Sequence, residues 1–374
     1  MEKLADFYDK QAGQKPLLHA HSVDAAQQGF PKACKTAKAC KNIGLNSSYP
    51  HKRKPYRSTI WKNTGISKTE DEKLQLALAR GQSPIFIELP PNLKNLAKEC
   101  FVEMRLVYNK NHKFYQWHVV VDDGMDSKVA SGTNVIGIDL GEIHPVAATD
   151  GETSVVFSAR ALRSVNQYSN KWLASFQSKI SKKKKGSQSY KRMMARKRKF
   201  LAKQARRRKD IEQKVSRAVV DYAVERNCNE IAIGDVRKVA NKCKLGKKSN
   251  QKVSNWSHGK IRTMIEYKAN AEGISVTMVK EHYTSQTCPN PDCQHKYKPS
   301  GRTYRCPVCG FVGHRDVVGS ANILSRRLFG ELARVPVKEP KYRFAYRICG
   351  RNERSPADTR HVVCGINPTE ATTL

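Results

Sequence analysis

Hydrophobic and polar residues follow a strand-like pattern between residues 84 and 121. IFIEL is a short apolar run, and FVEMRLVY and FYQWHVVV are apolar at every second position on either side of a turn-like segment at residues 109–111. This alternation predicts a β-hairpin with one buried face. We expect a small β domain over residues 76–130, preceded over residues 1–75 by short helices and polar, basic loops.

A second set of patterns fills residues 131–330. Five apolar runs predict strands: VIGID ending at Asp139, residues 146–149, 154–158 and 229–236, and ISVTMVKE ending at Glu281. Helical patterns occupy residues 159–226, with a break at Gly186, residues 259–270, and the segment that begins at Arg315. The resulting order, β-β-β-α-β-α-β-α, is that of an α/β ribonuclease H-like domain. Residues 331–374 lose this periodicity, so we expect most of this tail to be disordered.

The net charge of the chain adds a class of partner to this picture. The 374 residues include 69 Lys and Arg against 33 Asp and Glu, a formal net charge of +36. Such an excess implies a polyanionic partner, and nucleic acid is the first candidate. An anionic membrane is the alternative. No apolar run is long enough to span a bilayer and no signal peptide is recognisable, so we expect no membrane partner.

Basic residues are densest in the segment KKKKGSQSYKRMMARKRKFLAKQARRRK of the predicted helical pair. Like charges at helical spacing repel one another, and binding to phosphates would relieve this repulsion while releasing counterions. We therefore expect nucleic-acid contacts from Lys182, Lys183, Lys184, Lys185, Lys191, Arg192, Arg196, Arg198, Arg206, Arg207 and Arg208.

The N-terminal stretch PHKRKPYRSTIWKN interleaves basic and aromatic residues. This composition suits phosphate contacts combined with stacking on bases, and the candidate residues are Lys54, Tyr56, Arg57 and Trp61. A basic surface whose aromatic residues anchor in the core is equally compatible with the sequence.

Four of the 11 cysteines form two short pairs within residues 284–313, Cys288 with Cys293 and Cys306 with Cys309. Two such pairs around a spacer that contains Gly and Pro are typical of a zinc ribbon, because each tight turn presents two thiolates to a tetrahedral Zn²⁺. A free-standing ribbon that only binds a partner is the alternative. The other seven cysteines are scattered, which favours free thiols in a reducing, cytosolic compartment.

Two carboxylates lie where the pattern predicts buried structure: Asp139 ends an apolar strand, and Asp316 begins the last helix. A carboxylate in an apolar setting is costly unless a cation compensates it. In a ribonuclease H-like domain, carboxylates from the first strand, a later strand end and the last helix meet at one point. Such oxygen ligands suit two Mg²⁺ or Mn²⁺ ions that cut a phosphodiester. For Asp139 taken alone, a structural salt bridge is the alternative.

The motifs that carry these residues resemble those of the transposon-encoded OrfB/TnpB proteins, compact RNA-guided nucleases similar to type V CRISPR effectors. The resemblance rests on GIDLG with Asp139, YTSQTC before the ribbon, CPVCG in its second Cys pair, and HRDVVGSANIL with Asp316. It implies a RuvC-like nuclease domain over residues 131–330, a wedge-like domain over residues 76–130 and a reduced recognition segment over residues 1–75, which looks short for the family.

The same resemblance implies the partners. They are a guide noncoding RNA and a DNA target, double-stranded and then single-stranded, in a prokaryotic cytoplasm where DNA binding associates the protein with the nucleoid. The N-terminal segment and the wedge-like domain would hold the guide RNA and read a short motif that flanks the target.

The second acid of the family departs from its usual place. The family carries a Glu at the end of the fourth strand, where this chain has Gly234 in the triplet Gly234-Asp235-Val236. Asp235 is one residue out of register, and neighbouring strand residues point to opposite faces. Glu281 ends the adjacent fifth strand and can reach the same site, so we prefer Glu281 to Asp235 as the replacement.

Three functions remain open from the sequence. The leading one is an RNA-guided, Mg²⁺-dependent DNA endonuclease in which base pairing gives the specificity. The second is an RNA-guided DNA-binding regulator that has lost cleavage through the change at Gly234. The third is a DNA-only transposase or an accessory protein of transposition, for which no dimerisation segment is identifiable.

Overall fold

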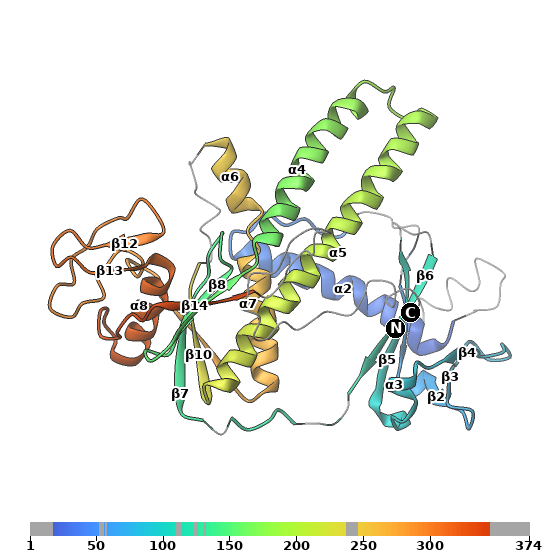
Figure 1. The fold of residues 1–374 in the computed structure, drawn as a ribbon. Coiled ribbons are helices and arrows are strands. Elements are labelled where there is room, and N and C mark those ends of the chain that lie inside the picture. The colour runs from blue at the N-terminus through green and yellow to red at the C-terminus, as the bar shows by residue number, and fades with distance from the viewer. Residues whose placement is uncertain are drawn as a thin grey trace, which may run out of the picture. The chain divides into compact units, whose positions relative to one another are not determined.

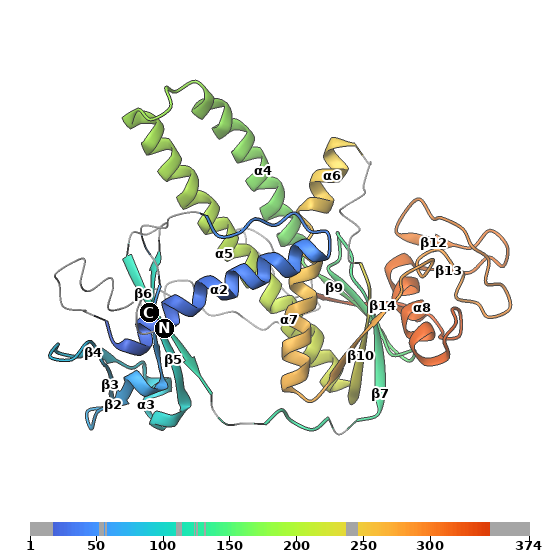
Figure 2. The same ribbon diagram turned by 180° about the vertical axis from the view of Figure 1, so that it is seen from behind.

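The chain divides into two compact units, the first ending at residue 125 and the second beginning at residue 126. The computed structural model describes residues 18–51, 56, 58–109, 114–122, 124, 126–130, 132–236 and 246–344 (Figures 1 and 2). Each unit has its own hydrophobic core, and the unit boundary falls a few residues before the expected one after residue 130.

The first unit contains two small antiparallel sheets and one long helix. The predicted hairpin is confirmed as β5 (Phe101–Asn109) and β6 (Phe114–Val121), which β1 (Thr59–Lys62) extends in the order β1-β5-β6. The second sheet has the order β2-β3-β4, with β2 (Ile66–Lys68), β3 (Lys73–Leu76) and β4 (Ile85–Glu88). The helical elements are α2 (Ala20–Asn42), α3 (Pro91–Lys94) and the 3₁₀ helices η1 (Asn63–Gly65) and η2 (Lys98–Cys100).

The expectation of helices and loops up to residue 75 is wrong for β1, β2 and most of β3. The reason is burial, because Trp61, Leu74 and Leu76 enter one core with Phe101 and Met104. Trp61 is only 2% exposed, and its Nε1 donates a hydrogen bond to the Ala77 carbonyl oxygen at 2.8 Å. The suggested stacking of Trp61 on nucleic acid is therefore wrong, and the core-anchoring alternative holds for this residue.

The second unit is built around a six-stranded sheet with the order β11-β10-β7-β8-β9-β14. Its strands are β7 (Asn134–Asp139), β8 (Val146–Thr149), β9 (Ser154–Ser158), β10 (Cys228–Gly234), β11 (Ser275–Val279) and β14 (Pro340–Phe344). β7, β8 and β9 form an antiparallel meander, whereas β10 runs parallel to both β7 and β11. The predicted order of strands and helices is confirmed up to β11 and the helix that follows it.

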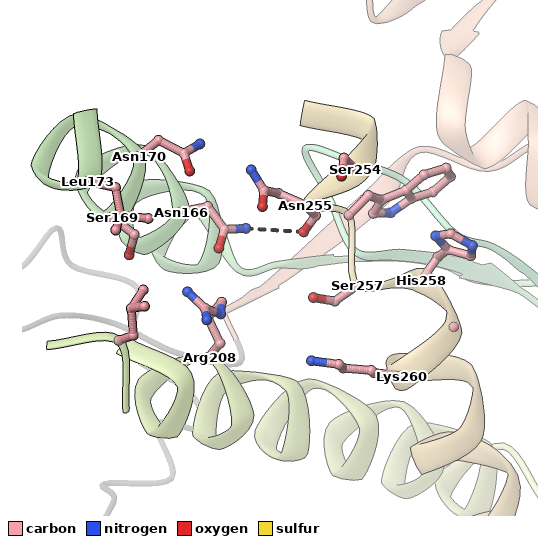
Figure 3. Close-up of a pocket in the computed structure, with 13 residues that line it drawn as sticks. Asn166, Ser169, Asn170, Leu173, Arg208, Ser254, Asn255, Ser257, His258 and Lys260 are labelled. Carbon is pink, nitrogen blue, oxygen red and sulfur yellow. Dashed lines mark hydrogen bonds between the residues drawn. The ribbon is translucent and has the colours of Figure 1, made fainter. Parts of the chain in front are cut away.

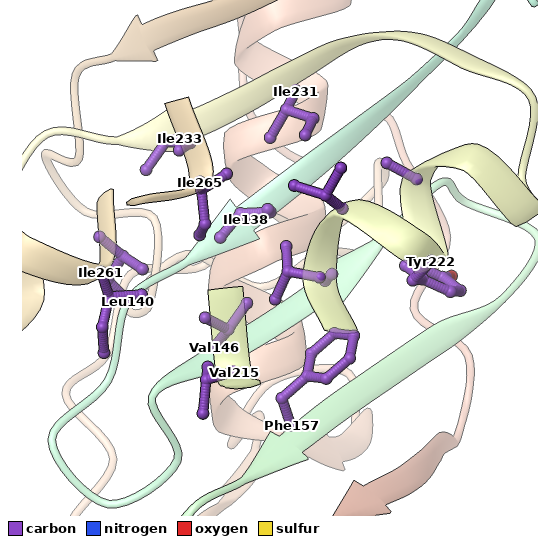
Figure 4. Close-up of a cluster of buried hydrophobic side chains, with 14 of the residues drawn as sticks. Ile138, Leu140, Val146, Phe157, Val215, Tyr222, Ile231, Ile233, Ile261 and Ile265 are labelled. Atoms are coloured by element: carbon purple, nitrogen blue, oxygen red, sulfur yellow. The ribbon is translucent and has the colours of Figure 1, made fainter. Parts of the chain in front are cut away.

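Helices cover both faces of this sheet (Figures 1 and 2). Parts of α4 (Arg160–Ser181) and α5 (Gln188–Glu225) pack with α7 (His258–Ala271) on one face, and α8 (Arg315–Phe329) packs on the other. The short helix α6 (Lys247–Ser254) projects away from the sheet. Alternate residues of β10 serve the two faces: Ile231 and Ile233 pack with α5 and α7 in the main core (Figure 4), and Ala232 packs with Ile323 of α8.

The last strand corrects the expectation that most of residues 331–374 is disordered. Within residues 331–344, Val335 and Val337 pack against the core, and β14 pairs in parallel with β9, Tyr342 opposite Val156. An open sheet edge exposes unpaired backbone groups, and β14 satisfies those of β9. Residues 345–374 lie outside the described part of the chain.

Among the described helices, none combines the length and the apolar character that crossing a bilayer requires.

Candidate active site

The three candidate carboxylates come from three elements of the second unit. Asp139 is the last residue of β7, Asp316 lies in the first turn of α8, and Glu281 follows the end of β11 at Val279. Glu281 was expected to end the fifth strand, and the structure places it two residues beyond that strand. Because β10 lies between β7 and β11, Glu281 must reach across the end of β10 to approach Asp139.

Glu281 reaches across by lying over Gly234. A Cβ atom at position 234 would contact the Glu281 carboxylate oxygen Oε1 and would lie 2.7 Å from its Cγ and 2.8 Å from its Cδ. The Glu281 side chain therefore fills the space that a side chain at 234 would need. Its Oε1 is buried and has no hydrogen-bond partner among the described residues, so a polar atom is held ready for a ligand.

Electrostatics link Asp139 to the other two carboxylates. Burial raises the pKa of Asp139 well above its usual value, and the charges of Glu281 and Asp316 raise it further. α8 approaches this carboxylate closely, since a Cβ at Gly319 would lie 2.8 Å from Asp139 Oδ2. α8 therefore packs closely on the sheet at the candidate site.

Burial also raises the pKa of Glu281, to about 7, with the charge of Asp235 as the second cause. Asp235 is half-buried, and its backbone N–H donates to the Val279 carbonyl oxygen at 2.8 Å. Asp235, the alternative acid, is therefore a neighbour of Glu281. The buried oxygen without a hydrogen-bond partner belongs to Glu281. Carboxylates that raise one another's pKa form a site that a cation would stabilise.

Asp316 is paired with a residue of the ribbon. The Arg302 guanidinium donates from Nη1 to both Asp316 oxygens, at 2.8 and 2.7 Å. Asp316 is 7% exposed, whereas the Arg302 side chain is 41% exposed, so this guanidinium covers a buried carboxylate from the solvent side. The Arg302 guanidinium lies where a cation would bind Asp316. A metal ion there would have to share the Asp316 oxygens with Arg302 or displace it.

Two histidines border the same carboxylate. The rings of His144 and His314 lie 5.9 Å apart, and the Nδ1 of each is buried without a hydrogen-bond partner in the described structure. Burial lowers the pKa of both, and the charge of Asp316 opposes this. Arg302 was missed as a site residue because no local motif marks it, and His144, which the sequence suggests is a loop histidine rather than a ligand, is buried beside Asp316.

The four ribbon cysteines converge as the spacing predicted. The ribbon contains the two-stranded sheet of β12 (Thr303–Arg305) and β13 (Val312–His314), and all four sulfurs lie within 4.8 Å of one another. Among the described residues this is the one group of His, Cys, Asp or Glu close enough to hold a metal ion. Cys288, Cys306 and Tyr304 pack with Val318, which attaches the ribbon to α8 beside Asp316.

One thiol of this cluster is prepared for ligation. Burial works to raise the pKa of Cys306, but hydrogen bonds from the backbone N–H groups of Cys309 and Val308 outweigh it and lower the pKa to about 7. Burial raises the pKa of Cys288 above its usual range. A bound cation would favour the thiolate of both.

The basic segment forms the tip and the arms of the α4–α5 hairpin (Figure 1). Nearly all of the expected contact residues are exposed there, namely Lys182, Lys183, Lys184, Lys185, Lys191, Arg192, Arg196, Arg198, Arg206 and Arg207. Arg208 is half-buried and lines a cavity instead. Trp172 joins the two helices, because its ring stacks on Phe176 at 4.3 Å and on Phe200 at 3.7 Å.

The N-terminal candidates have different outcomes. Tyr56 is exposed, and its ring stacks on Tyr108 of β5 at 3.9 Å, which leaves an aromatic surface on the hairpin. Lys54 and Arg57 lie outside the described residues.

Two family models match the chain. The model described as "Probable transposase" (OrfB_IS605) matches residues 118–240, and the model described as "Cas12f1-like, TNB domain" matches residues 258–323. The first range contains Asp139 and the α4–α5 hairpin, and the second contains Glu281, the four cysteines and Asp316.

Curated relatives agree with the models. The TnpB-like protein MJ0751 of Methanocaldococcus jannaschii is 29% identical over 131 residues, 34% of this chain and 46% of that protein. The CRISPR-associated endodeoxyribonuclease Cas12f1 of Sulfoacidibacillus thermotolerans is 29% identical over 111 residues, 29% of this chain and 24% of that protein. InsQ of Escherichia coli K12, provisionally named an RNA-guided DNA endonuclease, is 26% identical over 56% of this chain and 54% of its own. The chain thus spans about half or less of the relatives it matches.

A solved structure supports the fold. The protein in the cryo-EM structure of a Cas12f1–sgRNA–target DNA complex aligns with a TM-score of 0.53 over 78% of this chain and 68% of its own, at 13% identity. Together, the family models, the curated relatives and this fold show that the chain is related to the OrfB/TnpB and Cas12f1-like proteins.

Proposed function

We propose that this protein is an RNA-guided DNA endonuclease of the transposon-encoded type, whose catalytic carboxylates are Asp139, Glu281 and Asp316. The observation that carries the proposal is the position of Glu281, which fills the space of the missing side chain at Gly234 and presents a buried, unpartnered oxygen. The family carries a Glu where this chain has Gly234, and here the carboxylate of Glu281, from the segment after β11, would take the place of that Glu.

The donor set fits divalent metal ions. Its ligands are all oxygen, and Mg²⁺ or Mn²⁺ prefers such ligands. Two bound ions would activate water and stabilise the leaving oxygen of the phosphodiester. Asp139 and Glu281 are held protonated more readily than free carboxyls, so they must lose their protons before they bind cations. Arg302 balances the charge of Asp316 until then.

For the ribbon we propose a structural Zn²⁺ bound by Cys288, Cys293, Cys306 and Cys309. Tetrahedral zinc with Zn–S bonds of about 2.3 Å separates its sulfurs by roughly 3.8 Å. The Sγ atoms of Cys288 and Cys309 lie 3.5 Å apart, and those of Cys293 and Cys306 lie 3.6 Å apart, which supports this assignment. The ion would fix the ribbon and, through Val318 and Arg302, the start of α8.

The partners follow from the relatives and from charge. A guide noncoding RNA and a DNA target would bind the exposed cations of the α4–α5 hairpin, and Tyr56 would contribute stacking on bases. The same proposal includes a wedge-like role for residues 76–130 and a recognition role for residues 1–75. It also includes a cytoplasmic, nucleoid-associated location.

The test is a cleavage assay with protein co-expressed with its neighbouring noncoding RNA, a matched DNA target and Mg²⁺. Wild type is compared with Asp139→Ala, Glu281→Ala and Asp235→Asn, and the exposed carboxylate variant Glu339→Gln serves as the control. We expect wild type, Asp235→Asn and Glu339→Gln to cut, and Asp139→Ala and Glu281→Ala to be inactive.

Two other outcomes would favour a different assignment. Cutting by Glu281→Ala together with loss of cutting by Asp235→Asn would transfer the role of third acid to Asp235. Specific binding of the matched target without any cutting by wild type would support the guided DNA-binding regulator, which the absence of an acid at Gly234 favours.

A further inference from the structure

A polar cavity lies beside the candidate active site and is separate from its carboxylates. It has a volume of about 460 Å³, is partly open to solvent, and is bounded by α4, α5 and the segment that joins α6 to α7 (Figure 3). This volume is within the range of roughly 300–1,000 Å³ that is usual for small-ligand sites. The proposed catalytic mechanism makes no use of it.

Two cations line this cavity without a counter-charge. Figure 3 shows Arg208 of α5 and Lys260 of α7 directed toward the space between Asn166 and Ser257. Neither cation has a hydrogen bond or an ion pair within the described part of the chain, and no Asp or Glu lines the cavity. A half-buried, unpaired guanidinium favours an anion, and a guanidinium beside an ammonium matches the oxygens of a phosphate.

The rest of the lining suits a nucleobase. It provides the amides of Asn166, Asn170 and Asn255 together with the side chain of Trp256. Amides can both donate and accept hydrogen bonds with base edges, and an aromatic ring offers a stacking surface. Asn166 already donates to the Asn255 carbonyl oxygen at 3.4 Å, a long bond that a ligand can replace.

A second cavity continues from the first toward the carboxylates. It has a volume of about 260 Å³ and shares Asn166, Asn170, Asn255, Trp256 and Ser257 with the first. Its other lining includes the loop directly after Asp139, from which the Gly141 carbonyl accepts a hydrogen bond from Trp256 Nε1 at 2.9 Å. A Cβ at Gly141 would lie 3.9 Å from Asp316 Oδ2, so this loop borders the catalytic site.

We propose that the two cavities hold a nucleotide of the single DNA strand that is led to the carboxylates. Arg208 and Lys260 bind its phosphate, and the amides with Trp256 receive its base. The inference rests on the proposed function, because it names a binding site for the substrate strand of that nuclease. A base must leave its stack to enter such a site, which favours a single strand over a duplex because unpairing costs a few kcal/mol.

The experiment uses the full chain and a single-stranded DNA oligonucleotide that carries 5-iododeoxyuridine. Ultraviolet light couples this base to an aromatic residue in contact with it, and peptide mapping identifies the residue. We expect cross-linking at Trp256, and a decrease of about tenfold in its yield for Arg208→Gln/Lys260→Gln, since charge-assisted bonds to one phosphate are lost.

The matched control removes two charges from α5 outside the cavity, Lys203→Gln/Lys209→Gln; both residues are exposed. It should lower overall affinity in proportion to charge but leave the fraction of cross-links at Trp256 unchanged. Lys260→Gln alone, an exposed position, keeps the test valid if the double variant fails to fold.

Bound DNA that cross-links elsewhere, or equal losses in the cavity variant and the control, would overturn the proposal while leaving the nuclease function intact. Cross-linking of the corresponding 5-iodouridine RNA at Trp256 in place of DNA would overturn it in favour of guide RNA. The nuclease function is tested separately, by the cleavage assay that compares wild type with Asp139→Ala.

Discussion

The cysteine cluster and the carboxylate cluster are both candidate metal sites, yet the chain assembles them in opposite ways. The four cysteines belong to one short segment, and their sulfurs converge through two local turns. The carboxylates come from the end of β7, the segment after β11 and the start of α8, which only the complete sheet brings near one another, and their oxygens are less closely grouped than the four sulfurs. A site built from one segment depends on the spacing of its residues in the sequence. A site built from separate elements depends only on where its side chains lie, so a different residue can supply the same oxygen ligand.

The largest effect is expected when the local site is broken. Cys306→Ser removes a buried ligand, and metal binding to such ribbons contributes on the order of 10 kcal/mol to their folding. We expect loss of one equivalent of zinc, unfolding of residues 284–313 and loss of cleavage, measured by elemental analysis and hydrogen exchange. Cys34→Ser, in the other unit, is the control. Retention of zinc by Cys306→Ser would contradict the four-cysteine assignment.

The exchange of acids is tested at Gly234. Gly234→Glu alone forces a side chain into the volume of Glu281, and such overpacking costs about 1–3 kcal/mol. In the Glu281→Ala background the same change has room, and we expect it to restore cleavage to a protein that Glu281→Ala inactivates. Thermal melts and cleavage rates measure the two effects. If the double variant folds and binds its target but stays inactive, a carboxylate placed in this space from position 234 cannot replace Glu281.

The pH dependence of stability should report the protonation of Glu281. The pKa of its carboxyl rises from the usual 4.5 to about 7 on folding, so between these values the folded state binds more protons than the unfolded state. Stability therefore falls as pH rises through this window, by about 2–3 kcal/mol in wild type relative to Glu281→Gln. Urea unfolding without added Mg²⁺ or Mn²⁺ measures it. Parallel curves for the two proteins would mean that Glu281 is not buried as described.

The smallest effect concerns the contact between the two sites. Arg302 of the ribbon occupies both oxygens of Asp316, so Arg302→Gln should raise the affinity of the carboxylates for Mn²⁺ by about fivefold, roughly 1 kcal/mol. Isothermal titration measures this affinity. Arg305→Gln, an exposed residue of the same ribbon, should have no effect. Weaker Mn²⁺ binding by Arg302→Gln would indicate that the guanidinium supports the metal site rather than competing with it.

The sequence predicted most where a short pattern decides the structure. The limits of β8 and β9, the ribbon turns and the place of Asp316 in the first turn of α8 all follow from local periodicity. The path of Glu281 over Gly234 was expected only as a preference, because it depends on which strand ends are adjacent.

The failures have the same cause. Trp61 and Leu74 belong to strands because distant residues such as Phe101 bury them, and β14 is a strand because β9 offers it an open edge. Arg302 has no motif of its own, and its role as the partner of Asp316 appears only when the ribbon folds onto α8. Long-range contacts of this kind leave no mark in a single sequence.

The pairing of β14 with β9 also has a consequence for biosynthesis. The two strands lie far apart in the chain, so a ribosome makes β9 long before residues 340–344 exist. During that interval the nascent sheet presents β9 as an unprotected edge, the kind of surface on which other chains assemble. Production of this protein should therefore depend on chaperone supply and translation speed, and early release of the chain before Pro340 should yield aggregates.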